Sequence, residues 1–358
     1  MKRISIKPVW TLLDTDGNAL PPRLLELLVQ VQAHGSLLAA CQHLGLSYRH
    51  AWDLVRQGEA HFNAALLHMA RGKGSTLSAL GEKLVWADHR ISARLKPVLD
   101  SLASELAVEI HRAVVGEPIA LRVQASHGYA IAHLLDQLVA GGMAVERKYG
   151  SSIEAVAALR DGACDAAGLH LPIGPLQAGV LAHYQTWLQD RDVVVVDIAT
   201  RRQGLMVAPG NPCKIYELRD LLRSDVRFIN RQAGSGTRFL IEQLLQAQGL
   251  AHDLIPGFEQ GEFTHAAVAA YVASGMADVG FGLETPARQF KLDFLPLAHE
   301  RYFLLTHADT LAQAPMQALL AALQQPELRD AIHALPGYQT TDAGRVTPLA
   351  QAFMTSAE

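Results

Sequence analysis

The sequence predicts an α/β protein built from a small helical head with a β-hairpin, one long helix and a two-lobed α/β domain. Three observations lead to this architecture. Two short helices around a glycine turn lie within Gly35–Leu84, followed by a hairpin. Apolar residues then recur at helical spacing from Gly81 to about Arg112. Beyond Glu117, short apolar runs typical of strands alternate with helical stretches.

Composition limits the class of protein. The 358 residues are 49% hydrophobic and 18% charged, which suits two or three globular domains. We place the domain boundaries at 1–82, 83–115 and 116–358. The net charge is -4, but the N-terminal third carries a small positive excess and the remainder a negative one. By charge, therefore, only the N-terminal third suits a polyanionic partner.

No targeting or membrane signal stands out. The start, MKRISIKPVW, lacks the apolar run of a secretory signal, and no run of about 18 apolar residues predicts a transmembrane helix. Cys41, Cys164 and Cys213 are far apart and have no metal-type spacing, which is typical of reduced thiols. We expect a cytoplasmic protein that has no membrane contact, no metal and no cofactor.

The head begins with a turn at Asp16-Gly17-Asn18, and a helix opens at Pro21-Pro22. Ser36 follows a glycine and can cap a second helix that runs to about His43. Gly45 provides a tight turn, and Ser47 can cap a third helix from Tyr48 to about Ala64.

A hairpin completes a winged helix-turn-helix, which binds DNA through the N-terminal residues of its second core helix. Leu66–Met69 and Thr76–Leu80 are the expected strands, and their cationic tip can follow the phosphate backbone. Arg49 can pair with guanine or with a phosphate. The alternative is a plain helical hairpin, which the wing and the long helix disfavour. The candidate DNA-binding residues are Ser36, Ser47, Tyr48, Arg49, His50, Asp53, Arg56, Arg71, Lys73 and Ser75.

The long helix carries apolar residues on one broad face, and Pro97 is expected to kink or divide it. A helix of this kind commonly pairs two protomers, so we expect a homodimer or tetramer. The apolar residues are Leu84, Val85, Ile91, Leu95, Val98, Leu99, Leu102 and Leu106.

The head resembles a known family. The runs Gly45-Leu46-Ser47-Tyr48 and Ala51-Trp52-Asp53, and the Gly72-Lys73-Gly74 wing, are similar to the DNA-binding domain of the molybdate-responsive ModE regulators. The resemblance covers about residues 20–110. LysR-type regulators share the architecture more distantly.

The remaining two thirds predict an α/β arrangement with mainly parallel strands. A repeat supports two similar lobes, because Val156–Gly168 and Val268–Gly280 both read as helix, glycine turn, aspartate and strand. Chance similarity in an alanine-rich chain is the alternative. The expected strands are Ala120–Gln124, Ala144–Tyr149, Ala166–Leu169, Val193–Thr200, Gly204–Ala208, Val226–Asn230, Val279–Leu283, Phe294–Leu297 and Arg301–Leu305.

Small hydroxyl residues and glycines precede several helices, where free N–H groups and the helix dipole favour an anion. The strongest candidate is Asn230–Arg238, which reads NRQAGSGTR and lacks the Walker A ending. An ordinary capped helix is the alternative for each junction. Histidines and Tyr302 can add donors, although such residues are often structural. The candidate ligand-binding residues are Ser126, His127, Ser151, Ser152, His170, Arg231, Gly234, Ser235, Gly236, Thr237, Arg238, Thr264, His265 and Tyr302.

This part resembles type II periplasmic-binding-protein folds, particularly the related domain fused to ModE-type heads. Asn230–Arg238, Thr264–Ala269, Ala277–Gly280 and Glu300–Tyr302 carry the likeness over about residues 118–335. The resemblance implies an oxyanion or small anionic ligand, with molybdate or tungstate as the leading candidate. A small carboxylate such as formate, or a pterin-linked metabolite, stays open.

Taken together, these features predict a ligand-responsive transcription regulator that binds double-stranded DNA. An enzyme of cofactor biosynthesis is a weaker alternative, because GxSxG, HExxH and Walker A sequences are absent. Asp165 and Asp278 both follow glycine turns, which favours structural roles over acid–base catalysis. A third alternative is a binding protein that buffers an anion without binding DNA.

Overall fold

The structure is a computed structural model that describes residues 4–13, 16–70, 74–116, 120–184, 186 and 192–353. The chain divides into two compact units. We call Lys7–Leu95 the head unit, and Lys96–Glu358 together with Met1–Ile6 the large unit. Within the described ranges, no helix has both the length and the apolar character needed to cross a bilayer.

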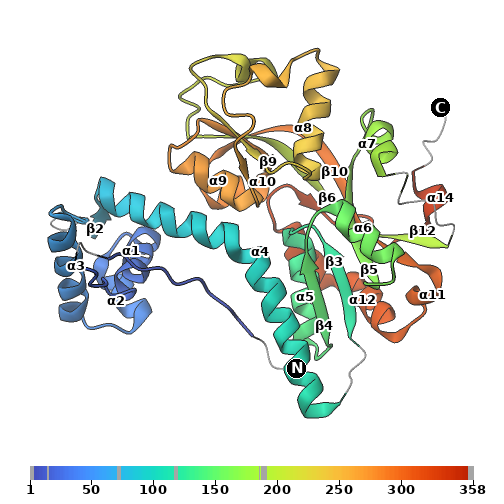
Figure 1. The fold of residues 1–358 in the computed structure, drawn as a ribbon, viewed down its shortest axis with the longest axis horizontal. Coiled ribbons are helices and arrows are strands. Elements are labelled where there is room, and N and C mark those ends of the chain that lie inside the picture. The colour runs from blue at the N-terminus through green and yellow to red at the C-terminus, as the bar shows by residue number, and fades with distance from the viewer. Residues whose placement is uncertain are drawn as a thin grey trace. The chain divides into compact units, whose positions relative to one another are not determined.

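The head unit has the predicted order of elements (Figure 1). Its helices are α1 (Arg23–His34), α2 (Leu37–Leu44) and α3 (Tyr48–Phe62), and its hairpin pairs β1 (Leu67–Ala70) with β2 (Gly74–Leu77). Ser36 Oγ accepts from Ala39 N at the start of α2, and Ser47 Oγ accepts from His50 N at the start of α3. Gly45 takes the left-handed conformation between the two helices. The predicted caps and turn are therefore confirmed.

Helix α4 (Ala79–Val115) continues through Pro97 as one element. Its predicted apolar residues range from buried, such as Val85, to exposed, such as Leu102. Val85 belongs to the apolar core of the head unit. In the large unit, Ala107 is buried, and Ser104 Oγ donates to Val145 O and accepts from Arg147 N. Other large apolar side chains of α4 are exposed, namely Leu95, Val98, Leu102, Leu106, Ile110 and Val114.

The large unit contains a mixed sheet in the order β4-β3-β5-β10-β6-β9-β7-β8. The prediction of mainly parallel strands is wrong for its centre, where β10 runs antiparallel to both β5 and β6, and β6 runs antiparallel to β9. Parallel pairing is found between β3 and its neighbours β4 and β5, and between β7 and its neighbours β8 and β9. The strands are β3 (Leu121–Ala125), β4 (Val145–Tyr149), β5 (Ala166–Pro172), β6 (Val193–Val207), β7 (Phe228–Arg231), β8 (Gly261–Glu262), β9 (Val279–Leu283), β10 (Asp293–His307), β11 (Tyr338–Gln339) and β12 (Val346–Pro348).

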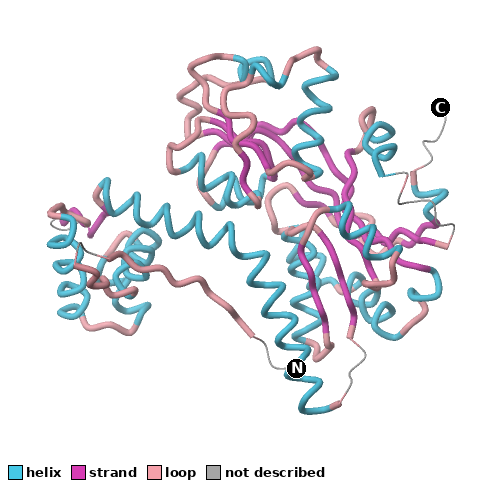
Figure 2. The backbone as a smooth tube through the Cα atoms, viewed as in Figure 1, coloured by secondary structure: helices cyan, strands magenta, loops and turns pink. Residues whose placement is uncertain are grey.

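Strands β6 and β10 each join two strands that the sequence predicted separately (Figure 2). The Glu300–Leu305 segment of β10 pairs with β5, whereas the Gln203–Val207 segment of β6 pairs with β9. The two long strands thus belong to both lobes of the sheet, and residues near 201 and 300 lie at the crossover.

Helices cover both faces of each lobe. On one face of the first lobe, α5 and α12 share an apolar core with β3, and on the other face α6 packs beside β5 (Figure 1). In the second lobe, α8 and α9 belong to separate cores on either side of β7 and β9. The helices are α5 (Tyr129–Ala140), α6 (Ser152–Arg160), α7 (Gln177–Tyr184), α8 (Gly236–Ala247), α9 (His265–Ala273), α10 (Glu284–Gln289), α11 (Ala308–Leu311), α12 (Ala314–Gln324), α13 (Pro326–His333) and α14 (Leu349–Ala352), with 3-10 turns at Leu218–Leu222 and His252–Leu254.

The internal repeat has a structural counterpart. Asp165 accepts from the Arg122 backbone N–H at 2.8 Å and from its guanidinium at 2.6 Å. Asp278 makes the same two contacts with Arg227, both at 2.9 Å. Each aspartate therefore holds the chain at the start of a neighbouring strand in its own lobe. This matches the structural role expected from the sequence.

Candidate functional site

A buried polar cluster lies where β6 and β10 cross between the lobes. Glu300 on β10 accepts from Arg201 Nε at 2.9 Å and from Gln203 Nε2 at 2.7 Å, both on β6. Arg201 and Glu300 are each 1% exposed, and Gln203 is fully buried. Because strand residues alternate between faces, Arg201 and Gln203 point to the same side of the sheet. We call these three residues and their polar neighbours the crossover cluster.

Four further side chains belong to the crossover cluster through direct contacts. Gln203 Nε2 also donates to Thr237 Oγ1 at 3.2 Å, and that hydroxyl lies 3.5 Å from His265 Nε2. The Arg201 guanidinium lies over the Tyr302 ring, 5.2 Å from its centroid, a geometry that favours a cation. His170 Nε2 is 3.9 Å from Glu300 Oε1. These contacts link residues of β5, β6, β10, α8 and α9.

Two helix N-termini border the cluster. Ser235 caps α8 by accepting from Arg238 N, so the first N–H groups of that helix belong to Gly236 and Thr237. Gly128 provides no side-chain cap for α5, and a Cβ added there would lie 3.6 Å from Arg201 Nη1. Free N–H groups and the positive ends of helix dipoles favour an anion.

Two glycines leave room for the rings of His170 and His265 in the crossover cluster. A Cβ added at Gly236 would lie 2.6 Å from His170 Nε2, and one added at Gly282 would lie 2.8 Å from His265 Nδ1. Both distances are too short for any side chain larger than hydrogen. These two ring nitrogens are buried and have no hydrogen-bond partner among the described residues. Because an unpaired buried polar atom costs free energy, such atoms at one place indicate a binding site.

Burial and neighbouring charges set the protonation of the cluster. Burial lowers the pKa of His170 to about 4 and holds that of His265 well below its ordinary value. Burial and the neighbouring Arg201 lower the pKa of Arg231 to about 10, so Arg231 stays charged at neutral pH. Burial alone would raise the pKa of Glu300, but Arg201, His170 and the hydrogen bond from Gln203 hold it below its usual value.

Arg231, at the end of β7, interacts electrostatically with Arg201 and Glu300 and so adds a charge to the cluster. Among these residues the cluster carries two positive charges, from Arg201 and Arg231, and one negative charge, from Glu300. Arg231 is 8% exposed and donates to the carbonyl oxygens of Glu262 and Phe263. Its charge is thus solvated by backbone rather than by a carboxylate. The cluster has a net charge of about +1 in a buried setting, where an anion is the natural partner.

Several predicted ligand residues belong to this cluster. Ser126 Oγ lies 3.5 Å from His170 Nδ1, and Tyr302 Oη is buried with no hydrogen-bond partner in the described chain. Gly234 has a positive φ of 78° next to the Ser235 cap. The predicted residues that form or shape the cluster are Ser126, His170, Arg231, Gly234, Ser235, Gly236, Thr237, His265 and Tyr302.

Other predicted ligand residues have different partners. Arg238 points away, since its guanidinium donates to Glu242 and to both oxygens of Glu259. Ser151 forms a reciprocal cap with Glu154 at the start of α6. Thr264 Oγ1 accepts from Ala267 N at the start of α9. For these residues the alternative of an ordinary capped helix or ion pair describes their contacts.

Two predicted residues lie beside aromatic or apolar neighbours. The His127 ring lies against Tyr149 with centroids 5.0 Å apart. Ser152 is 3% exposed in the first turn of α6. His127 Nε2 is buried without a hydrogen-bond partner among the described residues, and His127 interacts electrostatically with Arg231 and His265, so this residue lies beside the crossover cluster. Ser152 follows the Ser151 cap at the start of α6.

Sequence reasoning missed Arg201, Gln203 and Glu300. They fall in the two gaps left between predicted strands, because charged residues interrupt the apolar pattern there. A signal was present, since Arg201-Arg202-Gln203 lies within a strongly apolar run and holds no turn residue that would end a strand.

In the head unit, the predicted DNA-binding residues at the start of α3 are exposed together. Ser47 caps the helix, Tyr48, Arg49 and His50 form its first turn, and Asp53 and Arg56 are exposed further along it. Ser75 is 3% exposed and its Oγ accepts from Leu37 N, so we leave it out of the DNA surface. Arg71 and Lys73 lie outside the described residues. Ser36 caps α2.

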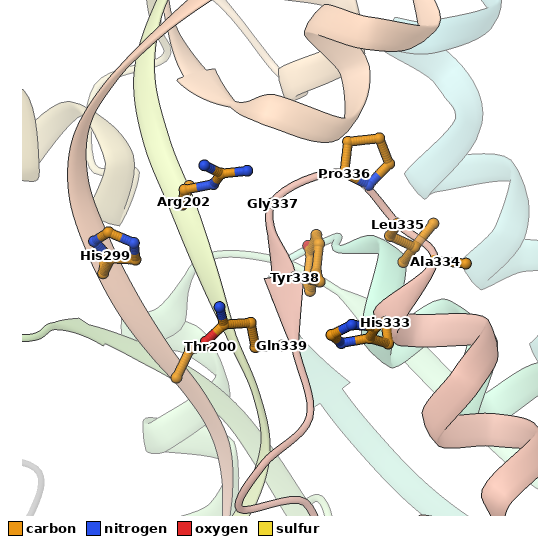
Figure 3. A pocket seen from close by; sticks show the side chains of 10 residues that line it. All are labelled: Thr200, Arg202, His299, His333, Ala334, Leu335, Pro336, Gly337, Tyr338 and Gln339. Carbon is orange, nitrogen blue, oxygen red and sulfur yellow. The ribbon is translucent and has the colours of Figure 1, made fainter.

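A further pocket of about 310 Å³ is lined by other residues of the same strands and by the segment that follows α13. Figure 3 shows Arg202 and His299 from β6 and β10, and His333 from the end of α13, around it. None of the predicted ligand residues lines it. Arg202 already pairs with Glu284 at 2.7 Å, and the histidines are exposed, so we place the ligand site at the crossover cluster.

Comparison with known families agrees with this division. Residues 135–324, more than half of the chain, match the PBP superfamily domain. The chain belongs to the PBP superfamily. In front of this PBP domain, residues 22–82 match the bacterial regulatory helix-turn-helix protein of the lysR family. The chain thus combines a LysR-type helix-turn-helix with a PBP-like ligand-binding domain.

Individual relatives are similar over parts of the chain. YvgK of Bacillus subtilis, described as uncharacterized, is 30% identical over 200 residues, which cover 56% of this chain and 64% of YvgK. The chain therefore spans less than two thirds of that relative. The molybdenum-pterin-binding protein MopB of Rhodobacter capsulatus is 30% identical over 122 residues, 33% of this chain and 44% of MopB. Among solved structures, an H2O2-bound mutant of Corynebacterium glutamicum OxyR aligns at a TM-score of 0.43 with 16% identity, over 84% of this chain and 90% of that one.

Proposed function

We propose that this protein is a transcription regulator that binds double-stranded DNA through its head unit and senses a small anion at the crossover cluster. One observation carries the sensing function. Arg201 is buried against the Glu300 carboxylate, and buried Arg231 donates only to backbone carbonyls, beside polar atoms that lack partners in the described chain. A regulator is favoured over an enzyme because the same chain carries a helix-turn-helix match over residues 22–82.

Two classes of effector have separate support. Molybdate or tungstate is supported by the ModE-like residues of the head and by a relative named for molybdenum-pterin binding. A small carboxylate such as formate is supported by charge, since one negative charge neutralises a cluster that carries about +1. Either anion can bridge the lobes, and differential affinity for open and closed states would couple binding to DNA.

The anion site is tested by thermal unfolding of the full chain with molybdate, tungstate, sulfate, phosphate and formate. Binding stabilises by RT ln(1 + [L]/Kd), so a ligand at about 100 Kd adds roughly 2.7 kcal/mol. Arg231→Gln should abolish the shift while keeping a cooperative transition. The matched control is Arg219→Gln, an exposed arginine of the large unit, which should keep it.

DNA binding is tested separately with a labelled fragment of the protein's own promoter region. Arg49→Ala removes an exposed cation from the start of α3 and should weaken binding by at least about tenfold. Arg219→Ala makes the same charge change in the large unit and should not. Equal effects of the two substitutions would place the DNA contact elsewhere and favour an anion-binding protein without a regulatory role.

A further inference from the structure

We propose that the effector is a singly charged anion that also donates a hydrogen bond. Small hydroxy carboxylates and protonated oxyanions such as hydrogencarbonate share this chemistry. The inference rests on the proposed anion site and names the class of ligand that site selects. Two observations support this inference: the net charge of the crossover cluster and the orientation of the Gln203 side-chain amide.

The charge of the described cluster sets the charge of the ligand. Arg201 and Glu300 neutralise each other through the 2.9 Å hydrogen bond, which leaves Arg231 as the uncompensated buried charge. His170 and His265 stay neutral at pH 7, because burial lowers the pKa of each ring. A monoanion brings the site to neutrality. An unprotonated dianion such as molybdate or sulfate leaves a buried negative charge, which is costly in a site removed from water.

The orientation of the Gln203 amide indicates that the ligand donates a hydrogen bond. Its Nε2 donates to Glu300 Oε2 at 2.7 Å, and a carboxylate can only accept. Swapping the amide oxygen and nitrogen would bring two acceptors to that distance, so the orientation is fixed. Gln203 Oε1 is therefore an acceptor, and it is buried with no hydrogen-bond partner among the described residues. A hydroxyl on the ligand supplies the missing donor.

The other unpaired polar atoms of the cluster can either donate a hydrogen bond to the ligand or accept one from it. Tyr302 Oη, His170 Nε2 and His265 Nδ1 are buried and lack partners in the described chain. A tyrosine hydroxyl both donates and accepts, and a neutral imidazole nitrogen does either according to its tautomer. Gln203 Oε1 and the Glu300 carboxylate can accept but not donate, so the ligand must donate to this side of the site.

Isothermal titration of the full chain with matched anions tests the inference. Acetate and glycolate carry one charge each and differ by a hydroxyl. We expect glycolate to bind at least roughly tenfold more tightly, the ratio that corresponds to about 1.4 kcal/mol. Formate and hydrogencarbonate form a second matched pair, which separates the oxyanion source from the hydroxy carboxylate. Sulfate and molybdate are expected to bind more weakly than the best monoanion.

Two variants make the test specific. Glu300→Gln removes one negative charge with little change in shape, and should move the preference at least roughly tenfold toward molybdate and sulfate. Glu327→Gln, on the exposed surface of α13, is the matched control and should leave selectivity unchanged. Gln203→Met removes the acceptor and should bring acetate and glycolate to similar affinity, with circular dichroism checking the fold.

The outcomes separate this inference from the proposed function. Wild-type protein that binds molybdate or sulfate more tightly than every monoanion overturns the inference and keeps the anion sensor. Acetate binding as tightly as glycolate also overturns it. Failure of every anion in both sets to bind overturns the proposed anion site itself.

Discussion

Arg201 and Glu300 are paired across the β6–β10 ladder, and their side chains meet at 2.9 Å although each is 1% exposed. The same two strands contribute to both lobes. A relative movement of the lobes would therefore change the geometry around the ion pair. An anion beside Arg201 would therefore act on the crossover rather than on one lobe alone.

Breaking this pair should destabilise the large unit. Glu300→Ala leaves the Arg201 charge buried without its partner, and we expect a loss of about 3–5 kcal/mol in the free energy of unfolding. Arg201→Met combined with Glu300→Ala should cost less than the sum of the two single changes, because no lone charge remains. Urea unfolding measures these values. Asp225→Ala breaks the exposed pair with Arg223 and should leave the free energy of unfolding nearly unchanged, because solvent screens this pair.

Gly236→Ala tests whether the close approach of His170 matters for ligand binding. The added methyl group would lie 2.6 Å from His170 Nε2, so the ring must move away from the start of α8. Anion affinity should fall at least about tenfold, while the helical propensity of alanine limits the loss of stability. Gly179→Ala is the control, since its methyl group meets its nearest neighbour at an ordinary 3.6 Å. Unchanged affinity in Gly236→Ala would remove His170 from the site.

Stability should fall as the pH drops from about 6.5 to about 4. Burial lowers the pKa of His170 from 6.5 to about 4, so in this range the unfolded chain binds more protons than the folded chain. The stabilisation is thus complete above pH 6.5 and is lost toward pH 4, and His265 acts in the same direction. Melting temperatures across this range measure the slope. His170→Gln should flatten it and the exposed His333→Gln should not, whereas identical slopes would contradict the assignment.

The local elements of the fold follow from sequence where one short-range rule decides. Ser36 and Ser47 were predicted as caps from their position alone, and both accept the expected backbone N–H. The repeat likewise identified Asp165 and Asp278 as equivalent residues. Arg238 was misplaced because the sequence does not show Glu259, twenty-one residues away, as its partner.

Short-range sequence rules could not predict the crossover cluster, because its residues are far apart in the sequence. Arg201 and Glu300 are 99 residues apart, and each looks like a strand end when its own segment is considered alone. Their burial is possible only because each neutralises the other, and that depends on the register of β6 against β10. If charged residues are assumed to be exposed, the predicted strands end at Arg201 and Glu300, although both long strands continue through these residues.

The exposed apolar residues of α4 lead to the last prediction, a dimer. Leu102, Leu106 and Ile110 recur every four residues and are 42–50% exposed, so they lie along one side of the helix. A second copy of the chain would bury this stripe, and each large apolar side chain removed from water contributes about 1.5–3 kcal/mol.

Leu106→Glu should convert the dimer to a monomer, as measured by light scattering during size-exclusion chromatography. Because the side chain is exposed, folding should be preserved. Glu105→Lys, its exposed neighbour, is the control and should keep the dimer mass, since it leaves the apolar stripe intact. A Leu106→Glu protein with unchanged mass would place the dimer interface elsewhere and leave the stripe unexplained.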